Sequence, residues 1–254
     1  MAKRRSVLLL GIAMLLNACG SIGSFRMLSP QLFGMDKVAS GLYIEPVMTQ
    51  EQRDELSKQI AIGRTSVERF WGEITTSPYF VACVTNICAA RFGSQGDRAT
   101  AFGDRAIRLS PNGLIAPLVA HEWSHVELYH RMGGVLHMEK IPRWFDEGIA
   151  VVIANEPRHS QENWLEIQRR GLSTPALSEL SSRSDWISAV KKYGETNVDD
   201  PNNLRVVYSV AGRELRRWLA CSGASGIPSL LAAVRDGELF AEAYSRLGCT
   251  GTDR

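Results

Sequence analysis

The feature that most restricts the fold of this chain is a pair of histidines four residues apart in a helix-forming stretch. The stretch covers residues 114–132, and the motif H-E-W-S-H runs from His121 to His125. Residues i and i+4 lie on one face of a helix, so both imidazoles can contact the same ion. Zn²⁺ accepts such a pair at about 2.0–2.1 Å from each nitrogen. The pattern therefore predicts a helix, closed by two glycines, that carries half of a zinc site.

A carboxylate further along the chain is the candidate for a third ligand. It is Glu147 in P-R-W-F-D-E-G-I-A, one turn into a second predicted helix that begins at Pro142. Gly148 beside it allows two helices to approach closely. Two histidines and one glutamate, with water in the fourth position, form a known catalytic zinc site. The sequence thus predicts one Zn²⁺ per chain, held by His121, His125 and Glu147.

Together the two motifs resemble those of the gluzincins, in particular the compact peptidase domains whose second helix reads Pro-x-Trp-(Leu/Phe)-x-Glu-Gly-x-Ala. The resemblance covers about residues 80–250, and its specific motifs lie within 118–151. It implies a zinc-dependent endopeptidase or aminopeptidase, with a peptide or protein substrate and Glu147 as third ligand. The implied fold is zincin-like α+β, with a small N-terminal β-sheet lobe carrying the active-site helix and a helical C-terminal lobe. It also implies an edge strand just before the zinc helix, for which Ala106–Leu109 is the candidate.

One position departs from the pattern of some gluzincins, which carry an acidic residue four places after the third ligand as a partner to a histidine. This chain has Val151 there. Support for the histidine must then come from Asp146, from a backbone carbonyl or from another loop. Weak support of this kind costs about 10–100-fold in metal affinity or activity.

The chemistry expected of such a site is hydrolysis of a peptide bond. The metal lowers the pKa of water towards ~7, and Glu122 accepts its proton and returns it to the leaving amine. The oxyanion needs a donor besides the metal. We expect Tyr208 to serve, since related peptidase domains carry a tyrosine in a comparable place; the alternative is a buried tyrosine packing with Leu215 and Leu219. Tyr193 and His137 are lower-ranked candidates.

The first residues have the pattern of a signal peptide for export. Three basic residues precede an apolar run, Val7–Leu16, which is too short to cross ~30 Å of hydrocarbon. The run ends in L-N-A-C-G, which resembles the lipobox of bacterial lipoproteins, whose cysteine, here Cys19, is acylated. No acidic residue follows it directly, and this resembles the sorting pattern for the outer membrane, facing the periplasm. The alternative is an ordinary secretory signal cut near Ala18. We expect a signal peptide at 1–18 and a tether at 19–40.

Four cysteines remain in the exported part, an even number that favours disulfides. We expect the pairs Cys83–Cys88 and Cys221–Cys249. A two-residue turn between Cys83 and Cys88 would place them opposite each other on paired strands, within disulfide reach. The alternative is reduced or metal-binding thiols, although the spacing matches no common zinc–thiolate pattern.

The remaining pattern places one domain at 41–254, divided into a lobe at 41–134 and a mostly helical lobe at 135–254. Thr49 and Gln52 form a capping box at the start of a long helix. Residues 135–141 and 171–203 are expected as loops. Strands are expected at 41–47, 79–84, 87–92 and 106–109, and further helices at 49–71, 142–155, 160–170, 204–219, 227–234 and 238–247.

The balance of charges argues against nucleic acid as a partner, and three classes of function stay open. Removing Lys3, Arg4 and Arg5 with the signal leaves 26 of the 29 basic residues against 27 acidic ones, without the basic patch that nucleic-acid binding needs. A zinc peptidase of the cell envelope is the leading interpretation. The alternatives are a catalytically inactive, zinc-stabilised lipoprotein acting as a binding or assembly module, and a zinc hydrolase of another amide or ester, such as cell-wall peptide.

Overall fold

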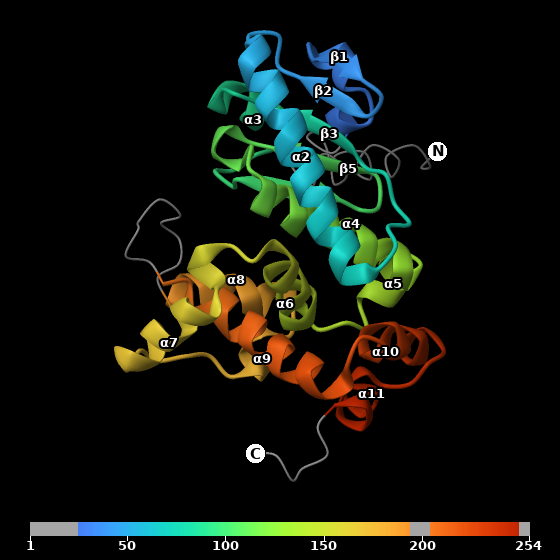
Figure 1. Ribbon diagram of the computed structural model, residues 1–254, viewed down its shortest axis with the longest axis vertical. Coiled ribbons are helices and arrows are strands. Elements are labelled where there is room, and N and C mark those ends of the chain that lie inside the picture. Colours follow the sequence, from blue (N-terminus) through green and yellow to red (C-terminus); the bar gives the residue numbers. More distant parts are fainter. Residues whose placement is uncertain (1–24, 194–203, 249–254) are drawn as a thin grey trace, which may run out of the picture.

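A small sheet lobe and a helical lobe make up the molecule, and the α+β class is confirmed (Figure 1). The computed structural model describes residues 25–193 and 204–248. The signal peptide, Cys19 and Cys249 lie outside the described residues. In chain order the elements are η1 (Pro30–Phe33), β1 (Asp36–Ala39), β2 (Leu42–Ile44), α2 (Gln50–Trp71), β3 (Tyr79–Ala82), α3 (Asn86–Arg91), β4 (Ala99–Phe102), β5 (Ala106–Leu109), η2 (Pro111–Gly113), α4 (Ala116–Met132), α5 (Val135–Met138), α6 (Arg143–Ala154), η3 (Pro157–His159), α7 (Gln161–Arg169), η4 (Leu177–Leu180), α8 (Arg183–Lys192), α9 (Val206–Ser222), α10 (Gly226–Arg235) and α11 (Phe240–Leu247).

The sheet has the strand order β1-β2-β3-β5-β4. The three central strands are parallel, and β1 and β4 run antiparallel at the two edges. The strand predicted at Ala106–Leu109 is confirmed as β5, but its assignment as the edge strand is wrong. All four of its residues are buried between β3 and β4. The edge strand next to α4, which carries the histidine motif, is β4. No strand was predicted there, and it forms because a tight turn at Gly103 places β4 beside β5.

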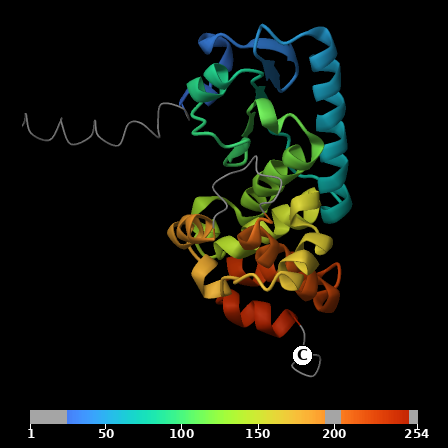
Figure 2. The ribbon, with the colours of Figure 1, turned by 90° about the vertical axis from the view of Figure 1, so that its left-hand side faces the viewer.

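Two long helices connect the sheet to the rest of the molecule. α2 begins as predicted, since Thr49 Oγ1 accepts from the Gln52 N–H at 3.2 Å and Gln52 Oε1 accepts from the Thr49 N–H at 2.9 Å. α2 runs alongside α4, as Figure 2 shows from the side. The two helices are closest at Gly63, where a Cβ would stand 2.6 Å from Val119 Cγ1. Only glycine fits this crossing, which fixes α4 against α2.

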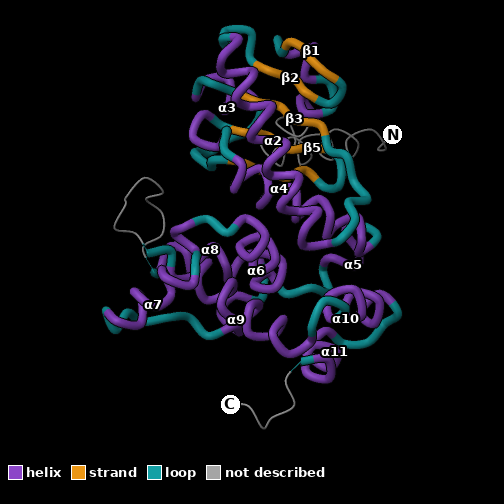
Figure 3. Tube along the Cα trace, in the orientation of Figure 1, coloured by secondary structure: helices purple, strands orange, loops and turns teal. Residues whose placement is uncertain are grey.

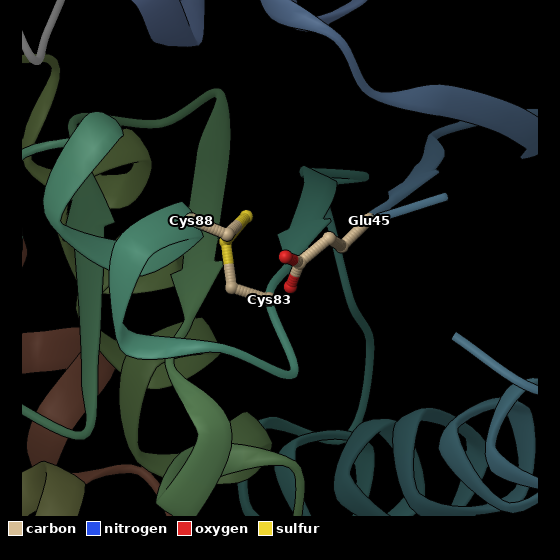
Figure 4. Close-up of side chains that lie close together, drawn as sticks. All are labelled: Glu45, Cys83 and Cys88. Atoms are coloured by element: carbon tan, nitrogen blue, oxygen red, sulfur yellow. A yellow bond between two sulfur atoms is a disulfide. The ribbon is translucent and has the colours of Figure 1, made fainter. Parts of the chain in front are cut away.

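The strand predicted at 87–92 is wrong, because that stretch forms α3. Thr85 caps this helix by accepting from the Cys88 N–H at 3.1 Å. The Glu45 carboxylate holds the turn before it by accepting from the N–H groups of Val84 and Thr85. Local caps of this kind compete with a hairpin for the same backbone groups. The predicted Cys83–Cys88 disulfide is confirmed, with an S–S distance of 2.03 Å, but it joins the end of β3 to α3 (Figure 4).

Residues 25–40, expected as part of a tether, belong instead to the folded lobe. β1 pairs with β2, and Met27 and Met35 are buried in a small core cluster with Cys83, Cys88 and other residues of β3 and α3. Burial of the two methionine side chains removes apolar surface from water and so holds this segment on the sheet. Of the predicted tether, residues 19–24 lie outside the described part.

The C-terminal lobe is helical, as Figure 3 makes clear. Its predicted helices are confirmed to within a few residues, but two expected loops contain helices, α5 and α8. α8 begins with a capping box of Ser182 and Asp185 and buries Trp186. The lobe is centred on the crossing of α6 and α9, where a Cβ on Gly148 would lie 2.9 Å from the Ala211 carbonyl oxygen. The close helix approach expected at Gly148 is therefore present.

Candidate metal centre

The buried face of α4 and the first turns of α6 meet between the two lobes. His121 and His125 lie on this face of α4, and Glu147 points towards them from α6. Glu147 Oε2 lies 3.3 Å from His121 Nε2 and 3.8 Å from His125 Nε2, and the candidate ligand atoms all lie within 4.8 Å of one another. Donors about 2.0–2.1 Å from a tetrahedral zinc ion stand roughly 3.3 Å apart. The three side chains are thus close to the spacing that a single ion requires.

Glu147 provides the test of whether these residues fit a cation. Its Oε1 accepts from Arg143 at 2.5 Å. Its Oε2 is buried, faces the two imidazoles and has no hydrogen-bond partner of adequate geometry among the described residues. A buried charged acceptor without a partner costs more than the 1–3 kcal/mol of a neutral one. A cation held by two imidazole nitrogens and this oxygen would satisfy it, so the residues present fit a metal ion.

Asp146 is the acidic residue that contacts His125, since position 151, which is acidic in some gluzincins, carries a valine here. Asp146 Oδ1 lies 2.6 Å from His125 Nδ1, and Asp146 Oδ2 accepts from Arg143. With the proton on Nδ1, the carboxylate orients the ring and leaves Nε2 available for a metal. Asp146 was one of three sources considered from the sequence. Val151 is fully buried and faces Gly212 of α9, so an acidic side chain there would lie in the helix crossing rather than in the site.

The charges around the site shift the pKa values of two of the three candidate ligands in opposite directions. Burial lowers the pKa of His125, but the charges of Asp146 and Glu147 outweigh it and raise this pKa to about 9. Burial raises the pKa of Glu147, yet Arg143 and the two histidines bring it well below its usual range. Near neutral pH a metal must therefore displace a proton from His125, while Glu147 is already ionised.

Glu122 is held at the edge of the sheet. Its Oε2 accepts from the Ala101 N–H of β4 at 2.7 Å. Because the Ala101 N–H donates to Glu122 of α4, it points away from β5, at the free edge of β4. The residue predicted as general base is thus tied to the free edge of the sheet, beside the face of α4 that carries His121 and His125. The hydrogen bond leaves its second carboxylate oxygen, Oε1, for other contacts.

A cleft of about 160 Å³ opens at this point and is lined by His121, Glu122, His159 and Tyr208, among others. Tyr208 comes from the first turns of α9, and its ring centroid lies 6.3 Å from that of His121. Its ring is half-buried and stands perpendicular to that of Trp186, with the ring centroids 5.0 Å apart. The structure therefore places Tyr208 in the cleft. Neither Tyr193 nor His137 is among the described residues that line it.

His159, which was not predicted from the sequence as part of the site, also lines the cleft. Its ring stacks on Tyr208, with centroids 5.0 Å apart and 20° between planes, and it is buried. Burial lowers the pKa of His159, and the charges of His121 and Arg158 lower it further, so its ring is neutral. No spacing in the chain signals this residue. It reaches the cleft because η3 turns back towards α9, a contact between segments about fifty residues apart.

A second cluster of metal-ligand types, formed by Glu45, Cys83 and Cys88, has a different role. The two sulfur atoms are bonded to each other, so they offer no thiolate, and the Glu45 carboxylate accepts from the turn before α3 (Figure 4). The pairing predicted for Cys221 and Cys249 lies outside the described residues. Among the residues that the structure describes, no helix has the length and apolarity needed to cross a membrane.

Comparison with protein-family models, with curated proteins and with solved structures finds no match for this chain. The likeness to gluzincins read from the motifs stays a prediction. The site is therefore interpreted from the chemistry and positions of its own side chains.

Proposed function

We propose that this protein is a zinc-dependent peptidase that cleaves peptide bonds in peptide or protein substrates. The observation that carries the proposal is the meeting of two imidazole nitrogens and one buried carboxylate oxygen from α4 and α6. Two nitrogen donors and one oxygen donor suit zinc better than magnesium or calcium, which prefer oxygen ligands. A carboxylate and a tyrosine line the cleft beside these ligands, in Glu122 and Tyr208. These are the two further groups that peptide hydrolysis needs.

In this proposal each side chain has one task. Zn²⁺, when bound, would polarise the substrate carbonyl and lower the pKa of the attacking water. Glu122 accepts the proton of that water and passes it to the nitrogen of the leaving amine. The Tyr208 hydroxyl donates a hydrogen bond to the carbonyl oxygen of the substrate, which gains negative charge when water attacks the carbonyl carbon. Asp146 holds the His125 ring in place, and Arg143 holds both Asp146 and Glu147.

The test separates metal binding from catalysis. Metal analysis of the purified protein is expected to find one zinc per chain, lost in His121→Ala. His130→Ala is the matched control, since His130 lies on the same helix but is half-exposed and 3.7 Å from Asp104. Glu122→Gln is expected to keep its zinc and lose cleavage of a quenched fluorescent peptide library. A wild-type protein that holds no zinc near neutral pH would overturn the proposal.

The same experiment addresses the inactive alternative. A zinc-stabilised binding module would hold one zinc and lose it in His121→Ala, but wild type and Glu122→Gln would both fail to cleave any peptide of the library. Cleavage of cell-wall peptides alone would point instead to the hydrolase of another amide.

We further propose that the protein is a lipoprotein of the bacterial envelope, acylated at Cys19 and anchored in the outer membrane, where it faces the periplasm. The L-N-A-C-G sequence after an apolar run of ten residues supports this. Mass spectrometry of the N-terminal peptide tests it, because acyl chains on Cys19 add a defined mass. An unmodified N-terminus near Ala18 or Cys19 would show an ordinary secretory signal.

A further inference from the structure

The segment that leads into the folded lobe divides its apolar side chains between the core and the solvent. Residues 25–33 contain Met27, which is 1% exposed and packs with Met35 in the small core cluster beside β3 and α3. Tyr79 strengthens this attachment, since its hydroxyl donates to the Met27 carbonyl. The segment is thus fixed to the protein by its inward side chain and by a hydrogen bond from β3.

The outward side chains of the same segment are large and apolar. Phe25, Leu28 and Leu32 are 64%, 63% and 81% exposed. Phe25 meets the edge of Phe33 with ring centroids 6.3 Å apart, so the aromatic residues form one group. Ile87 on α3 is 77% exposed, one turn before Arg91, whose side chain contacts this segment. Side chains of this kind cost about 1.5–3 kcal/mol each to leave in water rather than bury.

Basic side chains lie on the same segment and on the helix that it contacts. Arg26 donates to the Arg91 carbonyl, and Arg91 donates to the Phe33 carbonyl, so both guanidinium groups are held beside the exposed rings. Lys37 is exposed on β1. Asp36 is the one acidic residue within 25–37. An apolar group with a basic rim is the combination that binds the interface of an anionic membrane.

The position of Cys19 brings this surface close to a membrane. The described part of the sheet lobe begins at Phe25, and five residues separate Phe25 from Cys19. Six Cα–Cα steps span at most about 20 Å. If Cys19 carries acyl chains, the Cα atom of Phe25, at the start of the exposed group, cannot lie farther than this from Cys19 at the lipid surface. The predicted tether of 19–40 would have allowed more than three times that reach.

We propose that Phe25, Leu28 and Leu32, with Ile87 and the rim of Arg26, Arg91 and Lys37, form a membrane-docking surface that lies on anionic lipid. The proposed acylation supports this inference by bringing the surface to the lipid, and the proposed peptidase activity does not enter it. The segment belongs to the sheet lobe, and α10 and α11 lie at the opposite end of the molecule (Figures 1 and 2). The docked protein therefore holds its sheet lobe at the membrane and directs the helical lobe into the periplasm.

The experiment uses the full chain, expressed with its leader and reconstituted on vesicles of phosphatidylethanolamine and phosphatidylglycerol. Leu32→Cys carries an environment-sensitive NBD label on the docking surface. Leu165→Cys on α7, a leucine that is also exposed, is the matched control in the other lobe. Unsubstituted protein treated with the same reagent gives the background labelling. The Leu32 label is expected to gain fluorescence severalfold on the vesicles and to be quenched by doxyl lipids, and the Leu165 label to stay in water.

The outcomes separate docking from anchoring. If mass spectrometry finds Cys19 acylated and the Leu32 label stays accessible to aqueous iodide on the vesicles, the docking surface is refuted and the anchor stands. If Cys19 is not acylated and the Leu32 label still enters lipid, the surface stands and the anchor fails. A label that remains in water without acylation, at excess lipid, overturns the docking proposal as well. Zinc content and peptide cleavage are measured on the same samples and report on the proposed function independently.

Discussion

Replacing Asp146 by Asn should change how metal affinity depends on pH. The substitution keeps the size of the side chain and removes the charge that lies 2.6 Å from His125 Nδ1. That charge has two opposing effects on metal binding. It orients the ring and increases the basicity of Nε2, which favours the metal. It also favours a proton on His125, whose pKa is about 9, and this proton competes with the metal.

The magnitudes follow from that pKa. Below pH 9 the metal-free wild type carries a proton on His125 that zinc must displace, so affinity falls about tenfold, or ~1.4 kcal/mol, for each pH unit. Without the Asp146 charge the pKa of His125 moves down towards its ordinary value of ~6.5. Between pH 7 and 8.5 the slope of log affinity against pH is then about +1 for wild type and close to zero for Asp146→Asn. The loss of orientation lowers affinity by about 10–100-fold, and this deficit is largest at pH 8.5.

The assay is competition for zinc against a fluorescent chelator at pH 7, 7.5, 8 and 8.5, with circular dichroism to confirm that each variant is folded. Asp104→Asn is the control, since Asp104 lies near another histidine of α4, His130, but is exposed and outside the site. It should give the wild-type slope and affinity. Equal slopes for wild type and Asp146→Asn would refute the electrostatic argument, whatever their absolute affinities.

Three further predictions test other parts of the structure. Tyr208→Phe should keep zinc and the fold and lower the rate of peptide cleavage by about 10²–10³, measured under substrate saturation; an unchanged rate would remove Tyr208 from the mechanism. Gly148→Ala should lower the free energy of unfolding by about 1–3 kcal/mol in urea titrations, because the new methyl lies 2.9 Å from the Ala211 carbonyl oxygen, and a neutral effect would show that α6 and α9 can separate freely. Glu127→Gln should lower the free energy of unfolding by about 1–3 kcal/mol at pH 7, since the buried Glu127 carboxylate accepts from two threonines and Arg131, which outweigh burial and lower its pKa. A lowered pKa contributes stability above the pKa of the unfolded chain and loses it as pH falls through the folded value. The difference in stability from wild type should therefore shrink below pH ~4, and a difference that persists there would contradict this origin.

The sequence was most informative where the structure depends on neighbours within one or two helical turns. The spacing of His121 and His125 places both rings on one face in any regular helix. Thr49 and Gln52 form a capping box with hydrogen bonds that span three residues. The start of α6 after Pro142 and the Cys83–Cys88 disulfide also lie within short stretches. These features were predicted because their partners are close along the chain.

Local patterns failed where two local solutions competed. Residues 87–92 have β-forming side chains, yet Thr85 and Glu45 satisfy the backbone of a helix start there. Glu45 is about forty residues away, so its contribution is invisible to a short window. β4 is likewise a strand because it finds β5 beside it, not because its own residues strongly favour one.

The groups around the candidate metal ligands are positioned by tertiary structure. The sequence leaves several possible partners for His125, and the packing of α6 against α4 selects Asp146. Tyr208 and His159 come together with His121 only because α9 and η3 fold across the same cleft. A helix sets the relative positions of residues four apart through its own hydrogen bonds, whereas side chains from separate elements are positioned by the packing of the whole core. The chain's local pattern therefore determines that His121 and His125 can face one ion, and the tertiary packing brings Glu147 to them and determines which groups surround all three.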